Sequence, residues 1–202
     1  MNVKDFCAFT AIALTFIGFA PYIRGIHRGT THAHVFSWLI WGITTGIVFF
    51  AQINAKAGSG AWPIGISGLI TLYIALLAFQ RKGDVAITPS DWLFFGAALS
   101  SIPIWYLSAE PLFAVIILTF VDLLGFGPTL RKAYQHPHKE NLGFFSLFAL
   151  RNSLVIIALN NYSLTTVLFP AAVGLACVSL IILVLFRRHL LKVTASRNDL
   201  SR

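Results

Sequence analysis

The stretch Gly-Phe-Ala-Pro-Tyr-Ile-Arg at residues 18–24 returns as Gly-Phe-Gly-Pro-Thr-Leu-Arg at residues 125–131. The two prolines in this stretch, Pro21 and Pro128, are 107 positions apart, and a loop with histidines and then a Phe-Ser pair follows each of them. The same separation relates Pro63 to Pro170. Self-similarity at a fixed long period is typical of an internal repeat. The sequence therefore predicts two copies of one structural unit.

The composition places these copies in a lipid bilayer. The chain is 57% hydrophobic and only 11% charged, with a mean hydropathy of +0.78, which an ordinary soluble domain does not reach. A helix needs about 20 mostly apolar residues to cross a hydrocarbon core of about 30 Å. Apolar runs of this length predict an all-α integral membrane protein whose seven transmembrane helices cover residues 6–25, 35–54, 61–80, 91–108, 111–131, 144–161 and 164–186.

The repeat divides these spans into two parallel three-helix repeats joined by a linker helix, a 3+1+3 arrangement. The predicted boundaries are 1–85 for the first repeat, 86–110 for the linker, 111–190 for the second repeat and 191–202 for a cytoplasmic tail. The linker span belongs to neither repeat, and without it the count is six. Cys7 and Cys177 both fall in apolar spans, and are interpreted as buried hydrophobic side chains rather than as a disulfide or a metal site.

Basic residues predict how the chain is oriented. The N-terminus and the loops that follow the second, fourth and sixth spans hold two basic residues, Lys4 and Lys56. The opposite side holds twelve, which are Arg24, Arg28, Arg81, Lys82, Arg131, Lys132, Lys139, Arg187, Arg188, Lys192, Arg197 and Arg202. The positive-inside rule then puts the N-terminus outside and the C-terminus in the cytoplasm. The net charge of +8 is thereby explained as a topology signal, and no nucleic-acid partner is expected.

Three helices, a connecting helix and three more, with a proline in the first helix of each triplet, resemble the SWEET and PQ-loop transporter superfamily. The resemblance covers about residues 6–188. The proline of the family's proline-glutamine pair stands here as Pro21 and Pro128, whereas Tyr22 and Thr129 stand in place of the glutamine. SWEET carriers resemble one another in an asparagine on the third helix of each triplet. This chain departs from that pattern with Ser67 and Thr71 in the first such helix and Cys177 and Ser179 in the second.

The resemblance and the parallel repeats together imply a membrane transporter, because such repeats enclose substrate sites where they face each other. The expected function is alternating-access movement of a small polar metabolite (sugar, amino acid or vitamin-like), with proton coupling left open. The alternative is a membrane receptor of the KDEL-receptor kind that binds a ligand without passing it. An enzyme is not expected, because no catalytic motif is present and only one carboxylate lies inside a span. No cofactor or metal is expected, and a homo-oligomer is left open. Short loops and the absence of a targeting leader favour a bacterial inner membrane.

Proline in a helix interior removes one backbone hydrogen bond and kinks the helix. Pro21 and Pro128 each lie near glycines, so the cytoplasmic parts of their helices can swing. Because the kink recurs in both repeats, the two prolines are predicted to act in gating. The competing interpretation is a static kink that lets helices pack closely.

Asp122 and Arg151 break the apolar pattern most sharply. A charge at mid-bilayer costs at least about 2.5–3.5 kcal/mol, so such residues normally face the interior and find a partner. Counting at 1.5 Å per residue puts the two roughly 13 Å and 10 Å from the cytoplasmic ends of consecutive helices. Their similar depth predicts a direct or water-bridged ion pair. Two interpretations of this pair stay open. It is either a structural pair that locks the fifth helix to the sixth, or a functional one in which Asp122 carries a coupling proton or Arg151 binds an anionic group of the substrate. The equivalent positions in the first repeat are Thr15 and Gly42, both uncharged.

Polar residues on the second and sixth spans are predicted to form the substrate site. On the second span, Ser37, Trp41 and Thr45 follow one helical stripe, with the Trp41 indole as a flat stacking surface. Trp38 lies near the cytoplasmic boundary and is assigned to the interfacial aromatic belt. The sixth span contributes Arg151 and Asn152, and the third contributes Tyr73, whose hydroxyl could equally well pack between helices.

Overall fold

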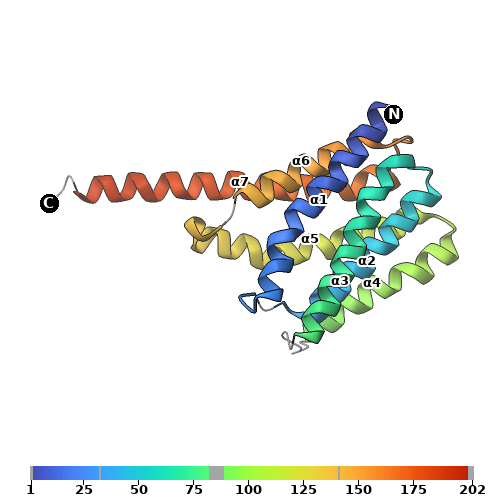
Figure 1. Ribbon diagram of the computed structural model, residues 1–202, viewed down its shortest axis with the longest axis horizontal. Helices are drawn as coiled ribbons and strands as arrows, with labels where there is room; N and C mark the ends of the chain where they lie inside the picture. Colours follow the sequence, from blue (N-terminus) through green and yellow to red (C-terminus); the bar gives the residue numbers. More distant parts are fainter. Residues whose placement is uncertain (1, 32, 82–88, 141, 200–202) are drawn as a thin grey trace.

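A computed structural model describes residues 2–31, 33–81, 89–140 and 142–199, except for the side chains at positions 90, 91, 128, 132, 139 and 193–199. In this part of the chain the regular elements are all helical. The α-helices are α1 (Val3–His27), α2 (Val35–Asn54), α3 (Trp62–Gln80), α4 (Pro89–Ser108), α5 (Pro111–Gln135), α6 (Leu142–Ala158) and α7 (Leu164–Asp199). Two short 3-10 helices, η1 (Gly58–Ala61) and η2 (Pro137–Lys139), precede α3 and α6 (Figure 1).

The helices coincide closely with the predicted apolar spans. Five of them are long and apolar enough to cross a bilayer, namely α1, α2, the η1–α3 segment, α5 and the Leu164–Lys192 part of α7. Trp92–Ser108 of α4 and Leu142–Ala158 of α6 are apolar but shorter. The main difference lies at the end of the chain, because α7 continues to Asp199 instead of ending near residue 186. The all-α prediction is confirmed, and the five long helices are compatible with an integral membrane protein.

The order of the helices along the chain gives two groups of three, one on each side of α4. We call α1–α3 the first half and α5–α7 the second half. Within the first half α3 packs against both α1 and α2, and within the second half α7 packs against both α5 and α6. The halves meet where α1 packs on α6 and where α2 packs on α5, whereas α4 lies against α5 and α2 (Figure 1). Helix α4 therefore sits on the outside of the bundle, where it packs on one helix of each half beside the α2–α5 contact.

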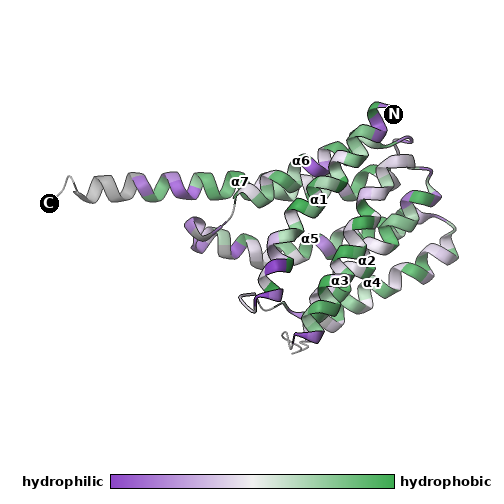
Figure 2. Ribbon diagram, viewed as in Figure 1, coloured by the Kyte–Doolittle hydropathy of each residue, from purple (hydrophilic) through white to green (hydrophobic). Residues whose placement is uncertain are grey.

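The outer surface of the bundle is as apolar as its core. Hydrophilic residues gather at the helix ends and along the C-terminal part of α7 (Figure 2). Large apolar side chains are exposed along the helices between those ends, among them Phe6, Phe9, Phe16, Phe50, Leu69, Phe79, Phe120, Leu175 and Ile182. A soluble monomer rarely exposes apolar patches beyond a few hundred Å². This surface is what a helical protein presents to lipid.

Hydrogen bonds between the two halves gather at one end of the bundle. Among the described residues, the bonds between segments 52–63 and 158–166 lie at this end, whereas the bond from Arg151 to Thr15 lies near the middle of α6 and α1. Backbone N–H of Asn160 donates to the carbonyl of Ala57 at 2.8 Å, and Nδ2 of Asn161 donates to the carbonyl of Ala55 at 2.9 Å. Oγ of Ser59 donates to the carbonyl of Ala158 at 3.3 Å. We call this end, which is the predicted outer end, the bonded end.

Pro170 adds a further bond at the bonded end. A proline inside a helix leaves the carbonyl four residues earlier without its usual donor, which for Pro170 is the carbonyl of Thr166. Nε2 of Gln52, a fully buried residue of α2, donates to this carbonyl at 2.8 Å. A side chain of the first half therefore completes the hydrogen bonding of a helix in the second half.

Candidate functional site

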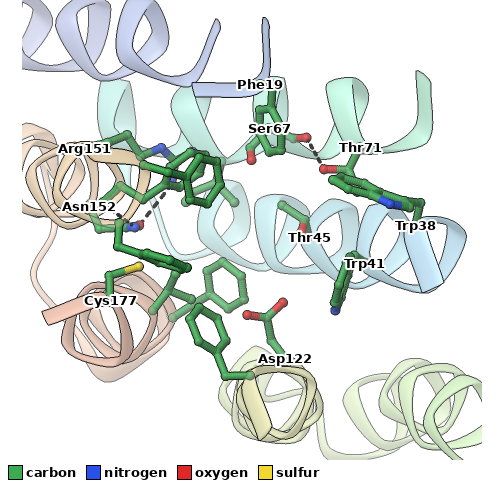
Figure 3. A pocket seen from close by; sticks show the side chains of 17 residues that line it. Phe19, Trp38, Trp41, Thr45, Ser67, Thr71, Asp122, Arg151, Asn152 and Cys177 are labelled. Atoms are coloured by element: carbon green, nitrogen blue, oxygen red, sulfur yellow. Dashed lines mark hydrogen bonds between the residues drawn. The ribbon is translucent and has the colours of Figure 1, made fainter. Parts of the chain in front are cut away.

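A cavity of about 190 Å³ lies between the two halves and is lined by residues of α1, α2, α3, α5, α6 and α7. Its aromatic lining consists of Phe19, Trp38, Trp41, Phe126, Phe144, Phe145, Phe148 and Phe169. Its polar lining consists of Thr45, Ser67, Thr71, Asp122, Arg151, Asn152 and Cys177. Ile64 and Val173 complete it, so α4 contributes no lining residue. Five residues of the predicted site, Trp41, Thr45, Asp122, Arg151 and Asn152, are brought together here (Figure 3).

Equivalent positions of the two halves line this cavity together. Four pairs of lining residues are separated by 107 positions, the same separation as between the repeated prolines. At this separation the equivalent of Arg151 is Thr44 and not Gly42, which the Phe-Ser pairs, 109 positions apart, had indicated. The pairs are Phe19 with Phe126, Trp38 with Phe145, Trp41 with Phe148, and Thr45 with Asn152. The cavity therefore lies at the place where both halves present the same helix faces to each other.

The expected ion pair between Asp122 and Arg151 is absent from the described structure. The two side chains enter the cavity from different helices and on different sides (Figure 3). The Asp122 carboxylate points into the cavity from α5 and has no hydrogen-bond or ion-pair partner among the described residues. The depths estimated from the sequence predicted that the two residues lie at one level of the bundle and form a pair. In the structure the cavity lies between them.

Arg151 instead connects three helices through neutral acceptors. Its Nε donates to the hydroxyl of Thr15 in α1 at 3.1 Å, one terminal nitrogen donates to Oδ1 of Asn152 at 3.0 Å, and the other donates to the carbonyl of Pro63 in α3 at 2.5 Å. The side chain is only 3% exposed. Nδ2 of Asn152 donates in turn to the carbonyl of Phe148 at 2.9 Å. A charge buried in this way is held by hydrogen bonds in place of a counter-ion.

Aromatic rings form the wall of the cavity on the α2 side. The indoles of Trp38 and Trp41 meet nearly at right angles, with their centroids 5.5 Å apart. Nε1 of Trp38 donates to the hydroxyl of Tyr22 at 3.2 Å, and Phe19 meets Trp38 edge to face. Trp38 thus faces the cavity and the core. Its assignment to the interfacial belt, which required a position at the bilayer boundary, is therefore wrong.

Glycines let two aromatic rings lie directly against neighbouring helices. A Cβ placed on Gly125 of α5 would come within 3.1 Å of Nε1 of Trp41. At the equivalent position of the first half, a Cβ on Gly18 of α1 would lie 2.5 Å from Cε2 of Phe148. The Trp41 indole therefore packs on α5 one turn from Asp122, which brings an aromatic ring and a carboxylate to the same wall.

Two predicted site residues lie outside the cavity. Ser37 is at the start of α2, where its backbone N–H donates to Nδ1 of His34 and its hydroxyl lies 2.7 Å from the same nitrogen. Tyr73 is 46% exposed, and its hydroxyl is 3.5 Å from Nε2 of His27. Ser37 is part of a helix start, and Tyr73 belongs to the outer surface.

The predicted gating prolines lie at equivalent places in α1 and α5. Pro21 is inside α1 and is exposed, immediately before Tyr22, the residue that holds Trp38. Pro128 lies within α5, and its side chain is outside the described part of the chain. Cys7 and Cys177 are both free and buried. The described residues contain no group of three or more His, Cys, Asp or Glu that could hold a metal ion.

Comparison with known proteins gives no relative for this chain. No family model, curated protein or solved structure matches it. The assignment of a function to the cavity therefore rests on the chemistry of the residues that line it.

Proposed function

We propose that this chain is a membrane transporter that moves a small polar metabolite by alternating access, with the central cavity as its substrate site. One observation carries the proposal: the cavity is lined by pairs of residues at equivalent positions of the two halves. A site on the axis between two repeats can be opened to either side by moving one half against the other. A binding site confined to one half would offer no such exchange.

The helix contacts support the 3+1+3 arrangement. A shift of 107 residues carries Val3–His27 onto residues 110–134, and α5 covers Pro111–Gln135. The same shift carries α2 onto the region of α6 and α3 onto the first part of α7. The contact of α1 with α6 then corresponds to that of α5 with α2, and α4 lies outside this set as a linker. These relations are those expected of a SWEET-like or PQ-loop protein.

Within this proposal the N-terminus is outside and the bonded end of the bundle faces the same side, in a bacterial inner membrane. The basic ends of α1, α3, α5 and α7 then lie in the cytoplasm. Labelling of single-cysteine variants, Lys56→Cys and Arg81→Cys, made after Cys7 and Cys177 are replaced by alanine, tests this orientation. An impermeant maleimide added to intact cells should label the first variant alone. Labelling of both from one side would exclude the seven-span topology.

Counterflow in proteoliposomes is the direct test of transport. Vesicles preloaded with a solute that binds the purified protein should accumulate its labelled form transiently and saturably. Trp41→Ala should remove most of this uptake, whereas Trp62→Ala, which changes an exposed tryptophan on α3, should leave it near the parent level. Saturable binding without counterflow would identify a receptor of the KDEL-receptor kind.

Asp122 is the proposed coupling residue within this mechanism. A carboxylate without a partner can take up a proton in one state and release it in another, which the amide of Asp122→Asn cannot do. Uptake by Asp122→Asn should therefore lose its response to an imposed pH gradient. A full response to the gradient in this variant would exclude Asp122 as the coupling site.

A further inference from the structure

We propose that the central cavity binds a small organic cation, whose positive charge pairs with the Asp122 carboxylate and lies against the Trp41 indole. This inference rests on the proposed function in taking the cavity as the substrate site. It adds the chemical class of the substrate, which neither the repeat nor the helix arrangement gives.

Asp122 supplies the charge that a cation would meet. Its carboxylate points into the cavity (Figure 3) and has no hydrogen bond or ion pair among the described residues. Keeping an unpaired carboxylate inside a membrane-spanning helix is expensive. A positively charged ligand offsets this cost when it binds, whereas a neutral ligand leaves the cost in place. The site is therefore incomplete without a positive charge.

Arg151, the other charged residue of the cavity, already has acceptors. All three of its guanidinium nitrogens donate, to Thr15, Asn152 and the carbonyl of Pro63. These bonds use three of its five N–H donors and hold three helices together, so an anionic ligand group would find only the two remaining N–H groups. The charged group that is still without partners is the carboxylate, so the preferred ligand is a cation rather than an anion or a zwitterion.

The aromatic lining suits the same ligand. Electron-rich ring faces attract cations, and a desolvated contact with tryptophan is among the strongest of this kind. The Trp38 and Trp41 indoles stand at 88° to each other, so they bound a corner on two sides. Gly125, three residues after Asp122, lets the Trp41 ring approach the helix that carries the carboxylate. One corner of the cavity therefore combines two ring systems with a negative charge.

The size of the cavity limits the ligand. A protein cavity of about 150 Å³ takes up benzene. At about 190 Å³ this cavity accommodates a compact molecule of roughly eight heavy atoms, such as an alkylammonium or a single-ring cation. A disaccharide or a peptide would not be enclosed.

Matched cation and neutral probes test the inference on the purified full-length chain in detergent. The pairs are choline with 3,3-dimethyl-1-butanol, and N-methylpyridinium with toluene, because the members of each pair share a shape and differ in charge. Quenching of tryptophan fluorescence or calorimetry gives the affinities. At least one cation should bind about tenfold or more tightly than its neutral partner. Equal affinity within both pairs would overturn the inference, as would tighter binding of the zwitterion glycine betaine than of choline.

Variants locate the bound charge. Asp122→Asn should weaken binding of the cation about tenfold or more, while the affinity for the neutral partner stays the same. Glu110→Gln, which removes an exposed carboxylate outside the cavity, is the matched control. The melting temperature of ligand-free Asp122→Asn should equal or exceed that of the parent, because a lone charge has been removed, and this separates lost binding from misfolding. Parental affinity for the cation in Asp122→Asn would overturn the inference.

The outcome for transport is read separately. Cation binding without counterflow would refute the transporter and leave the cation site standing. Counterflow of a neutral or anionic solute, with no cation bound more tightly than its neutral partner, would support the transporter and refute the cation site.

Discussion

Thr15 and Asp122 occupy equivalent positions in the two halves, yet they do opposite things. The Thr15 hydroxyl is fully buried, donates to the carbonyl of Ala11 at 2.7 Å and accepts the Nε–H of Arg151. The Asp122 carboxylate points into the cavity without a partner. The first half therefore uses this position to hold the bundle together, and the second half uses it to present a charge. A repeated fold can keep its helix packing and still change the chemistry of one side of its cavity.

The largest effect is expected at Arg151, which joins the halves at Thr15. Arg151→Lys keeps the buried charge but cannot reach three acceptors, so the free energy of unfolding should fall by about 3–5 kcal/mol. Arg151→Met removes the charge together with the bonds and should cost less. Unfolding in detergent measures the stability of both variants, and Arg81→Lys, a substitution on the surface, is the control. A lysine variant as stable as the parent would mean that these bonds contribute little.

The paired glycines give the next effect. Gly18→Ala puts a methyl group against the Phe148 ring and should cost about 1–3 kcal/mol through overpacking, partly offset by the better helix propensity of alanine. In Gly125→Ala the methyl group meets Nε1, Cζ2 and Cε2 of Trp41 at 3.1, 3.3 and 3.5 Å, which a small shift of the indole relieves, so its stability should stay closer to the parent. It should instead weaken cation binding, because the indole moves away from α5. A greater loss of stability in Gly125→Ala than in Gly18→Ala would show that the two halves pack differently from the structure described here.

A smaller effect is expected at Gln52, a contact that has no counterpart in the other half. The equivalent of Pro170 is Pro63, which lies in the first turn of α3, where a missing N–H costs nothing. Gln52→Leu should lower stability by about 1 kcal/mol, since one bond is lost while the unpaired Oε1 is removed as well. In a Pro170→Ala background, where the backbone N–H returns to Thr166, the same substitution should have almost no effect on the melting temperature.

The smallest expected effect is the coupling between Asp122 and Arg151. The two residues share no hydrogen-bond partner among the described residues, so the stability changes of Asp122→Asn and Arg151→Met should add to within about 1 kcal/mol. A direct buried pair would give a coupling of several kcal/mol. A double-mutant cycle with thermal unfolding as its readout distinguishes the two.

Much of the fold could be predicted because it depends on the length and hydropathy of single segments. The apolar run at 35–54 coincides with α2, and the shift of 107 residues relates the helices of the two halves. The end of α7 was missed because the basic residues after position 186 mark the boundary of the membrane, and a helix can continue in water beyond it.

The site was less predictable, because depth along a helix does not give direction around it. Equal depth suggested a contact between Asp122 and Arg151, although the two face the cavity from different sides. Trp38 was placed in the boundary belt by its depth alone, while Ser37, one residue earlier and about 100° around the helix, was placed in the site. The repeat did contain the missing signal for Trp38, since its equivalent, Phe145, also lines the cavity.

The bonds gathered at one end of the bundle have a consequence for motion. The bonds between segments 52–63 and 158–166 join the halves at one end and form a fulcrum there, whereas no hydrogen bond between the halves joins two described residues beyond Pro21 and Pro128. Small rotations about such a fulcrum separate the opposite ends of the halves while the joined end barely moves. Backbone amides near the fulcrum, such as that of Asn160, should then exchange with deuterium far more slowly than those near Pro21. Under the proposed function, we expect a ligand to enter and leave the cavity through the end that carries the basic residues.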